Sequence, residues 1–409
     1  MLLSFRFANH RSFRDEQHLN LTPVYETEAT DEAAVEAVPV VGIFGANASG
    51  KSNVISAFRY LSDTVGRSDQ QSEPNRRPHR QPFRLDPRAG AQPSSYTADL
   101  LLGGVRYTYG FSVDPDQITE EWLYSYPLRR KRVIFERTGR DFDWGEESRR
   151  SSVRKLADIV APTALLLSVS ARFEPRKLPE DGPDDTSEVM HRVFTWLWQK
   201  VLRDHQPGRR FRPYVQWLRQ PELRAAVVEL LRSADVGLQD AFVRDDEEVL
   251  FRHTGATDDV LFGYQEESSG TLRLLELAAR AVPVLNDGGL FLVDEIDASL
   301  HPLLTVALVR LFQNRKVNKQ GGQLLFTSHD ATLLGSIDGE DLLRRDEVWF
   351  TSKGDDGTSE LFSLAEFKPR RQGENRQKRY LNGSYGAIPE LSMHLFEQAI
   401  ASRTGPSAE

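Results

Sequence analysis

Hydrophobic and polar positions change their spacing several times along the chain, and each change predicts a different kind of element. Residues 1–7 and 18–21 have the spacing of β-strands. Residues 38–44 form a continuous apolar run, which is typical of a buried parallel strand, and residues 52–65 carry apolar side chains at helical spacing. The opening of the chain therefore predicts short strands, a buried strand ending in a glycine-rich turn, and a helix.

A strand-rich part and a helix-rich part follow. Four segments predict an antiparallel meander, in which Gly103 and Gly104 form the first hairpin turn. The four strands are residues 96–102, 105–113, 121–126 and 132–137. Residues 151–231 turn to helical spacing, whereas the acidic residues 26–36 and the polar residues 66–91 are expected to form loops.

The remainder of the chain alternates between strands and helices. Expected strands lie at residues 249–253, 289–293, 323–327 and 347–351, and expected helices at residues 271–284 and 303–312. The chain from Lys368 onward is basic and then helical. We find neither an internal repeat nor a long heptad array, so no long coiled coil is expected.

Composition narrows the class of protein. A chain of 409 residues with 39% hydrophobic content is long enough for two or three folded units. The absence of cysteine excludes disulfides, cysteine-ligated metal sites and thiol catalysis. No apolar run reaches the roughly 18 residues of a membrane-spanning helix, and the first residues lack the layout of a signal peptide. We therefore expect a cytoplasmic protein with no membrane partner.

The strongest chemical motif follows the apolar run at residues 38–44. It matches the pattern G-x-x-x-x-G-K-[ST] at every fixed position, after a buried strand and at the start of a helix. Its residues are Gly45, Ala46, Asn47, Ala48, Ser49, Gly50, Lys51 and Ser52. Backbone N–H groups of such a loop bind phosphate, Lys51 would contact the β- and γ-phosphates, and Ser52 would hold Mg²⁺. We include the adjoining Asn53 in the expected ATP site.

Three further motifs lie in the C-terminal half. The strand at residues 289–293 ends in Asp294, which suits the Mg²⁺ shell, and Glu295, which is placed to orient or deprotonate a water molecule. The strand at residues 323–327 is followed by His329, at the spacing expected of a histidine that senses the γ-phosphate. The residues around Ser269 open a helix, where they would form either an anion site or a plain N-cap.

The order of these motifs resembles that of the ABC-class ATPase heads of the SMC, Rad50 and RecF group. The resemblance implies an α/β P-loop NTPase fold, with a RecA-like core sheet, an antiparallel β lobe and a helical insertion. It also implies a dimer that encloses two ATP molecules, in which Ser269 and Gly270 of one protomer cap the γ-phosphate held by the other. Residues 297–302 resemble the segment that crosses the dimer seam, and residues 7–13 resemble an opening that places Arg11 near the nucleotide.

A narrower resemblance covers nearly the whole chain, to prokaryotic AAA/ABC-type ATPases of the RloA and abortive-infection kind. The segments that carry it are residues 82–85, 107–111, 120–124, 367–370 and 379–389. That family is associated with restriction loci and phage defence, commonly beside a separate effector protein. The resemblance therefore implies a sensor or regulator of an effector such as a nuclease, and it makes Gln81 the candidate for the Q-loop glutamine.

We expect four parts: an N-terminal half of the ATPase head (1–150), a helical insertion (151–240), a C-terminal half of the head (241–365) and a basic C-terminal segment (366–409). The expected reaction is Mg²⁺-dependent ATP hydrolysis by a head-to-tail homodimer or a higher oligomer. Lys51, Glu295 and His329 are the expected catalytic residues. No metal-nuclease cluster is visible, so any nuclease activity is expected in a partner.

Charge is segregated, although the whole chain carries a net charge of −8. Residues 129–155 and residues 368–379 each carry a net charge of +5, and residues 235–267 carry −8. Such basic segments fit a DNA or RNA backbone, an acidic protein partner or a solvated face. Tyr380 and Tyr385 could stack on bases or pack within the fold. A DNA-repair or recombination head that clamps DNA in an ATP-dependent way is the alternative, and a transporter ATPase is disfavoured.

Overall fold

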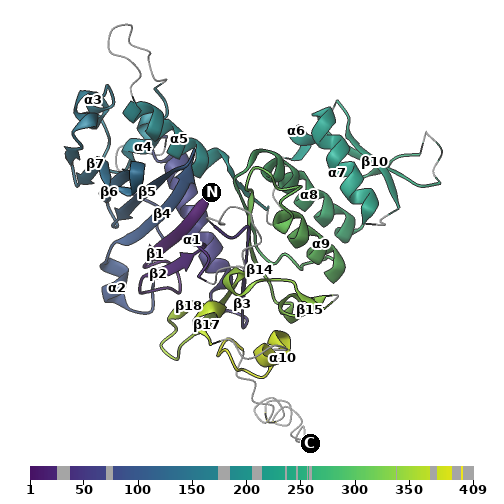
Figure 1. Ribbon diagram of the computed structural model, residues 1–409. Coiled ribbons are helices and arrows are strands. Elements are labelled where there is room, and N and C mark those ends of the chain that lie inside the picture. Colours follow the sequence, from purple (N-terminus) through teal and green to yellow (C-terminus); the bar gives the residue numbers. More distant parts are fainter. Residues whose placement is uncertain are drawn as a thin grey trace, which may run out of the picture.

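The computed structural model describes residues 1–24, 37–70, 77–173, 185–204, 214–234, 237–245, 247–255, 257, 260–337, 339–368, 375–388 and 398. The expected loop at residues 26–36 lies outside the described residues, as does most of the chain after residue 388. The basic segment 368–379 is described only at its first residue and from residue 375 onward. Figure 1 shows a lobe of strands and a lobe of helices that diverge from a central sheet.

The central sheet is mainly parallel. Its six strands, in spatial order, are β18 (Ser359–Ser363), β17 (Val348–Lys353), β3 (Val40–Gly45), β14 (Gln323–Thr327), β13 (Leu290–Val293) and β9 (Val201–Arg203). Only β18 runs antiparallel to its neighbour. Every residue of β3, β13 and β14 is buried, as expected for parallel strands covered on both faces.

Alternate residues of β3 face opposite layers of helices. Val41 and Ile43 pack in one apolar cluster with α1 (Lys51–Arg67). Val40 and Phe44 pack in a second cluster with α8 (Ser269–Asp287) and α9 (Pro302–Gln313). The expected α/β P-loop fold is confirmed, because the buried strand ends at the phosphate loop and the helix begins directly after it.

The strand-rich lobe is one antiparallel sheet. Its seven strands, in spatial order, are β2 (Gln17–Asn20), β1 (Leu2–Ala8), β4 (Ser94–Leu102), β5 (Val105–Val113), β6 (Ile118–Tyr126), β7 (Arg132–Thr138) and β8 (Asp141–Trp144). One face packs against α1, where the rings of Phe5 and Phe58 lie 4.8 Å apart. The same cluster takes in α5 (Asp185–Gln199). The expected meander is therefore confirmed, and the N-terminal strands belong to it.

The helical lobe packs on the other side of α8. It contains α6 (Tyr214–Leu218), α7 (Pro221–Ser233), β10 (Leu238–Val243), β11 (Val249–His253) and β12 (Phe262–Gly263). Leu274 and Ala278 of α8 belong to this third apolar cluster, whereas Leu277 and Ala281 belong to the cluster on the central sheet. One helix thus joins the helical lobe to the core.

The segment expected to be helical contains one strand that was not predicted. Its helices are α3 (Arg154–Ala157), α4 (Leu166–Ser170), α5, α6 and α7, but β9 lies between α5 and α6 and pairs with β13. The helices before β9 pack near α1, and those after it pack near α8. The division of the chain at residues 150, 240 and 365 stays a prediction.

The described C-terminal residues complete the core. They include β15 (Ser336–Ile337), β16 (Glu340–Asp341) and α10 (Arg376–Leu381). Tyr380 and Tyr385 stack on Phe350 at ring distances of 5.7 and 5.1 Å and are almost fully buried, so they are packing residues. A short helix, α2 (Pro87–Ala91), interrupts the expected loop at residues 66–91. None of the described helices is both long and apolar enough to cross a membrane.

Candidate functional site

The phosphate loop joins β3 to α1 and needs glycine at both of its ends. Gly45 and Gly50 have φ angles of +154° and +116°, a region that favours glycine. A Cβ atom at Gly45 would lie 2.4 Å from the Thr351 carbonyl oxygen, and one at Gly50 would lie 2.7 Å from the Ser359 hydroxyl. The loop is therefore held closely against β17 and β18, and any larger residue would displace it.

Lys51 lies inside this loop. Its ammonium donates hydrogen bonds of 2.8 Å to the carbonyl oxygens of Gly45 and Ala46, and the residue is only 5% exposed. Burial lowers the pKa of Lys51, while the negative charges of Glu295 and Asp294 act in the opposite direction. The loop thus presents a buried cation together with the backbone N–H groups of a helix start, an arrangement suited to an anion.

The two residues expected to hold Mg²⁺ meet at the ends of α1 and β13. Asp294 Oδ1 accepts hydrogen bonds from Ser52 Oγ at 2.9 Å and from Thr327 Oγ1 at 2.7 Å. Carboxylate and hydroxyl oxygens are the ligands that Mg²⁺ prefers, and phosphates and water complete its shell in sites of this kind. The donor set therefore fits Mg²⁺. Thr327 was not predicted, although it ends the strand next to the one that carries Asp294.

Glu295 and His329 lie together at the carboxyl ends of β13 and β14. His329 Nε2 is 3.4 Å from Glu295 Oε1, and the Glu295 side chain is 55% exposed. Glu295 has a φ angle of +53°, which is unusual for a residue other than glycine. Its amide donates a 2.8 Å hydrogen bond to Thr327 Oγ1, so the neighbouring strand holds this backbone conformation in place.

The structure also brings together Arg11, Gln81 and Asn53 beside the first turn of α1. The Arg11 amide donates to the Gln81 carbonyl oxygen at 2.7 Å, and the Arg11 guanidinium contacts the Gln81 side chain. A further bond of 3.3 Å reaches Asn53 Oδ1. Burial lowers the pKa of Arg11, as does the positive charge of Arg59. The predicted residues from three separate segments thus form one polar group next to the phosphate loop.

Ser269 and Gly270 lie at the start of α8, apart from this group. Within the described residues, no hydrogen bond joins either of them to the phosphate loop of the same chain. The N-cap is Ser268, whose hydroxyl accepts a 3.0 Å bond from the Thr271 amide. A Cβ atom at Gly270 would lie 3.1 Å from the Ser299 carbonyl oxygen, so the two segments expected at a dimer seam are adjacent.

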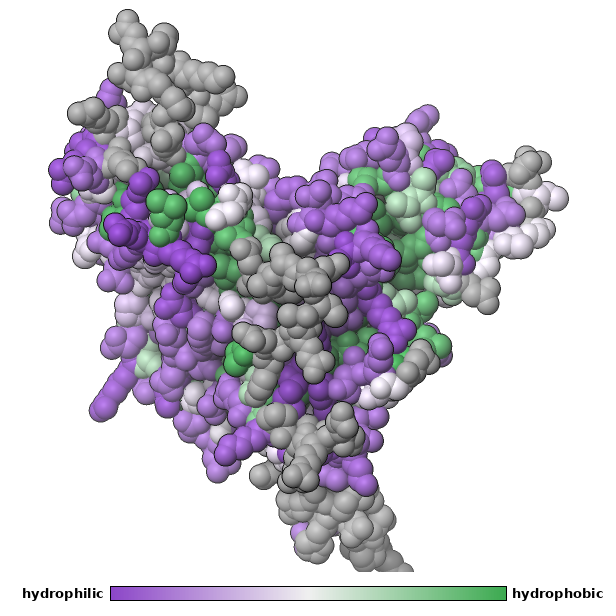
Figure 2. Space-filling view, in the orientation of Figure 1, coloured by the Kyte–Doolittle hydropathy of each residue, from purple (hydrophilic) through white to green (hydrophobic). Residues whose placement is uncertain are grey.

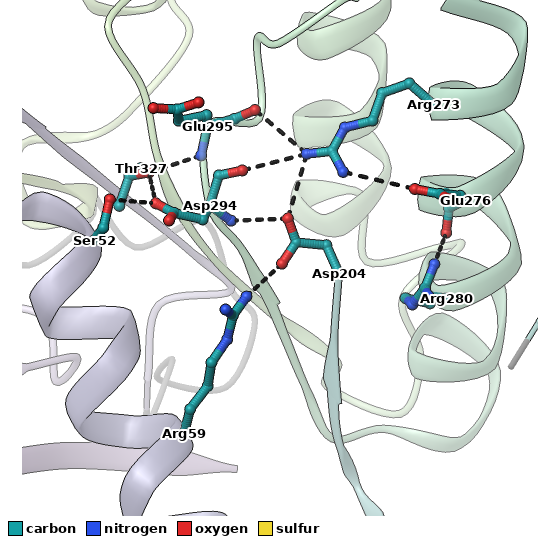
Figure 3. Close-up of polar contacts among 9 residues, drawn as sticks. All are labelled: Ser52, Arg59, Asp204, Arg273, Glu276, Arg280, Asp294, Glu295 and Thr327. Carbon is teal, nitrogen blue, oxygen red and sulfur yellow. Dashed lines mark hydrogen bonds and ion pairs between the residues drawn. The ribbon is translucent and has the colours of Figure 1, made fainter. Parts of the chain in front are cut away.

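One group of functional residues was missed at the sequence level. Asp204 follows β9 and lies between Arg59 of α1 and Arg273 of α8 (Figure 3). It also accepts a hydrogen bond from the amide of Asp294. No local motif marks Asp204, because its role depends on the pairing of β9 with β13.

Known proteins were compared with this chain by family and by structure. The family model described as "AAA domain, putative AbiEii toxin, Type IV TA system" matches residues 40–335. No curated protein matches the sequence. Similar solved structures include an SMC head domain from Thermotoga maritima, with 13% identity and a TM-score of 0.42 over 88% of this chain and 98% of that one.

Two other SMC heads are similar to the same extent. One is an SMC head bound to the C-terminal winged-helix domain of ScpA, with 13% identity and a TM-score of 0.43 over 88% of this chain and 97% of that one. The other, from Pyrococcus furiosus, has an extended coiled coil and is bound to the C-terminal domain of ScpA; it has 13% identity and a TM-score of 0.43 over 88% of this chain and 96% of that one. The family match includes the phosphate loop, both β13 carboxylates and His329, and the chain therefore belongs to this AAA-domain family of P-loop ATPases.

Proposed function

We propose that this protein hydrolyses ATP as a head-to-tail homodimer and thereby regulates a separate effector protein in prokaryotic defence against phage. The observation that carries the ATPase proposal is the junction of α1, β13 and β14, where Ser52 and Asp294 are hydrogen-bonded to each other. The family description names an abortive-infection toxin, and this supports a defence role with a partner protein. We place the protein in the cytoplasm.

Each residue at the junction has a distinct proposed role. Lys51 and the loop amides bind the phosphates, while Ser52 and Asp294 hold Mg²⁺. Bound Mg²⁺ neutralises the charge that develops on the phosphate oxygens. Glu295 orients the attacking water and accepts its proton, and His329, 3.4 Å from that carboxylate, reads the γ-phosphate. Arg11, Asn53 and Gln81 bind the remaining part of the nucleotide.

The dimer proposal concerns the surface around the start of α8. Ser269 and Gly270 of the partner subunit would complete the site, as the resemblance to ABC-class heads implies. Leu303, on the first turn of α9, is 63% exposed and lies close in sequence to Ser299. Figure 2 shows further hydrophobic residues on the surface near α8 and α9. An exposed apolar area of this kind supports a contact between protomers.

Two substitutions test the ATPase proposal. Lys51→Ala removes the buried cation, and we expect ATP binding to be lost in a fluorescence titration. Glu295→Gln keeps the shape of the side chain but removes the base, so ATP binding should persist while kcat falls by about 10²–10⁴-fold. An ATP-bound dimer should then accumulate, which light scattering would detect. The matched controls are Lys316→Ala, at an exposed turn, and Glu340→Gln, on the exposed strand β16. Hydrolysis by Glu295→Gln at the wild-type rate would contradict the assignment of Glu295.

The identity of the effector requires a separate experiment. The Glu295→Gln protein held in ATP is the best bait, because it keeps the dimer in the state that a regulated partner would recognise. Proteins that copurify with it in ATP, but not with Lys51→Ala, are the candidate effectors. A partner bound equally by both variants would speak against control by the nucleotide.

An ATP-dependent DNA clamp is the second candidate function. The observation that favours it is the turn between β6 and β7, where residues 128–132 are all exposed and four of the five are basic. Leu128 at the tip is 95% exposed. Four basic side chains at an exposed turn fit the phosphate backbone of duplex DNA.

A further inference from the structure

Asp204 is a buried carboxylate at the carboxyl end of β9, next to the proposed Mg²⁺ site. Its side chain is 7% exposed. Its own amide donates a 3.1 Å hydrogen bond to the carbonyl oxygen of Leu292, and its Oδ2 accepts a 3.2 Å bond from the amide of Asp294. Asp204 therefore holds the backbone on both sides of the end of β13.

Two arginines from opposite faces of the central sheet converge on this carboxylate (Figure 3). Arg59 of α1 approaches Asp204 Oδ1 to 2.5 Å, and Arg273 of α8 approaches Oδ2 to 3.4 Å. The Arg59 and Arg273 side chains are only 22% and 13% exposed. The same Arg273 nitrogen lies 3.3 Å from the carbonyl oxygens of Asp294 and Glu295. The Arg273 guanidinium is thus held at the backbone of Asp294 and Glu295, whereas the Arg59 guanidinium is held by Asp204.

A buried cation needs a partner, because removal from water is costly for an unpaired charge. Without the charge of Asp204, Arg59 would have no carboxylate partner among the described residues, and Arg273 would keep only Glu276, 4.0 Å away. The carboxylate of Asp294, whose backbone carbonyl oxygen already lies 3.3 Å from Arg273, would then compete for both guanidinium groups. A guanidinium bound there would occupy the oxygens that Mg²⁺ requires. The position of Asp204 between the two arginines prevents this competition.

We propose that Asp204 is a positioning residue, which keeps Arg59 and Arg273 away from the Asp294 carboxylate and thereby leaves it free to bind Mg²⁺. The inference rests on the proposed ATPase function and deepens it. Asp204 does not touch the nucleotide in this mechanism; it acts through the backbone of Asp294 and through the two arginines.

The test is the Mg²⁺ requirement of nucleotide binding in the full-length protein. A fluorescent ATP analogue is titrated in EDTA and at increasing Mg²⁺ concentrations. For Asp204→Asn we expect affinity in EDTA within about twofold of the wild type, and a Mg²⁺ concentration for half-maximal binding raised about tenfold, the usual cost of losing a partner of a metal ligand. Asp204→Glu keeps the negative charge but displaces it. This variant should therefore fold, and its Mg²⁺ concentration for half-maximal binding should rise about threefold.

Asp63→Asn is the matched control. Asp63 lies on α1, as Arg59 does, and pairs with β9 through a 2.6 Å contact to Arg203, the residue before Asp204. It has no hydrogen bond to Asp294 among the described residues. Its removal should lower the unfolding temperature without changing the Mg²⁺ requirement. Asp204→Asn in a background that also carries Arg59→Gln and Arg273→Gln should change the Mg²⁺ requirement less than twofold, because no guanidinium is left to compete.

Two outcomes would overturn the proposal. One is a wild-type Mg²⁺ requirement in both Asp204 variants, and the other is an equal increase in Asp63→Asn. Failure of the proposed function has a different signature: the wild-type protein itself would bind Mg²⁺ and ATP without hydrolysing it. Because the readout is binding, Asp204 can be tested in that case as well.

Discussion

His10 is fully buried near the start of the polypeptide, one residue before Arg11. Its Nδ1 lies 2.9 Å from the Tyr96 hydroxyl, and its Nε2 lies 3.1 Å from the Ser56 hydroxyl. Burial lowers the pKa of His10 from 6.5 to about 3, and the charge of Arg11 adds to the effect. Between pH 6.5 and about pH 3, the folded protein therefore keeps His10 neutral, whereas in the unfolded chain His10 binds a proton.

This difference predicts a specific dependence of stability on pH. The contribution of neutral His10 is fully present above pH 6.5 and is lost as the pH falls from 6.5 towards 3. The slope from this one group is about 1.4 kcal/mol per pH unit. In urea unfolding between pH 6 and pH 4, His10→Asn should show a shallower loss of unfolding free energy than the wild type. The exposed His191→Asn should keep the wild-type slope, and equal slopes in all three proteins would refute the prediction.

Single residues differ in how far the sequence can identify their role. Lys51 and Ser52 are recognisable because a phosphate loop is contiguous, and Asp294 because it directly ends an apolar strand. Thr327 and Asp204 are not recognisable, since each acts through a strand that becomes a neighbour of β13 only after folding. Local chemistry is thus predictable from spacing, whereas partners supplied by sheet pairing are not.

At the scale of elements, the contact between α1 and α5 depends on a glycine. Gly66, near the end of α1, is buried, and a Cβ atom there would lie 2.2 Å from the ring of Trp198. Two cations, Arg67 and Arg203, lie 5.1 and 5.7 Å from the centroid of the same ring. The absence of a side chain at Gly66 therefore permits the tryptophan to pack flat on the helix.

Gly66→Ala tests which of two opposite effects is larger. Replacing glycine by alanine within a helix stabilises it by up to about 1 kcal/mol, but overpacking costs about 1–3 kcal/mol. Because the clash is with an indole ring rather than a flexible chain end, we expect a net loss of about 1–2 kcal/mol in urea unfolding. Gly90→Ala in α2, whose nearest new neighbour would be 3.7 Å away, should not destabilise the protein. A stabilised Gly66→Ala would show that Trp198 moves aside at little cost.

Elements were predicted well where their pattern is long and poorly where it is short. The meander and the helices α1, α8 and α9 have enough residues to show their periods. Strand β9 has three residues, too few to establish alternation, and β18 and β10 fall beside charged turns. These strands are defined by the partner they pair with, which no local pattern reveals.

At the scale of the whole molecule, the tip between β6 and β7 offers a test of DNA binding. This tip lies at the end of the strand-rich lobe that holds Leu2. From Leu2, β1 runs towards the residues that contact α1, so the tip is at the end away from the phosphate loop. Arg129→Glu combined with Arg130→Glu should weaken binding to duplex DNA at least tenfold and reduce the salt slope by about 2.

Lys316→Glu combined with Lys319→Glu makes the same change of charge at an exposed turn after α9. The affinity and salt slope of this control, measured by fluorescence anisotropy at several salt concentrations, should stay close to those of the wild type. Equal loss in both double variants would indicate a response to overall charge and would remove the support for a DNA clamp.

The position of β3 in the central sheet has a consequence for biosynthesis. Its two neighbours are β14 and β17, which lie some 300 residues further along the chain. During translation, the phosphate-loop strand therefore stays unpaired until β14 has left the ribosome, and it gains its second neighbour only when residue 353 has emerged. Such non-local closure is slow and leaves apolar surface exposed. A nascent chain of this protein therefore cannot complete its nucleotide site before the residues of β14 and β17 have been made.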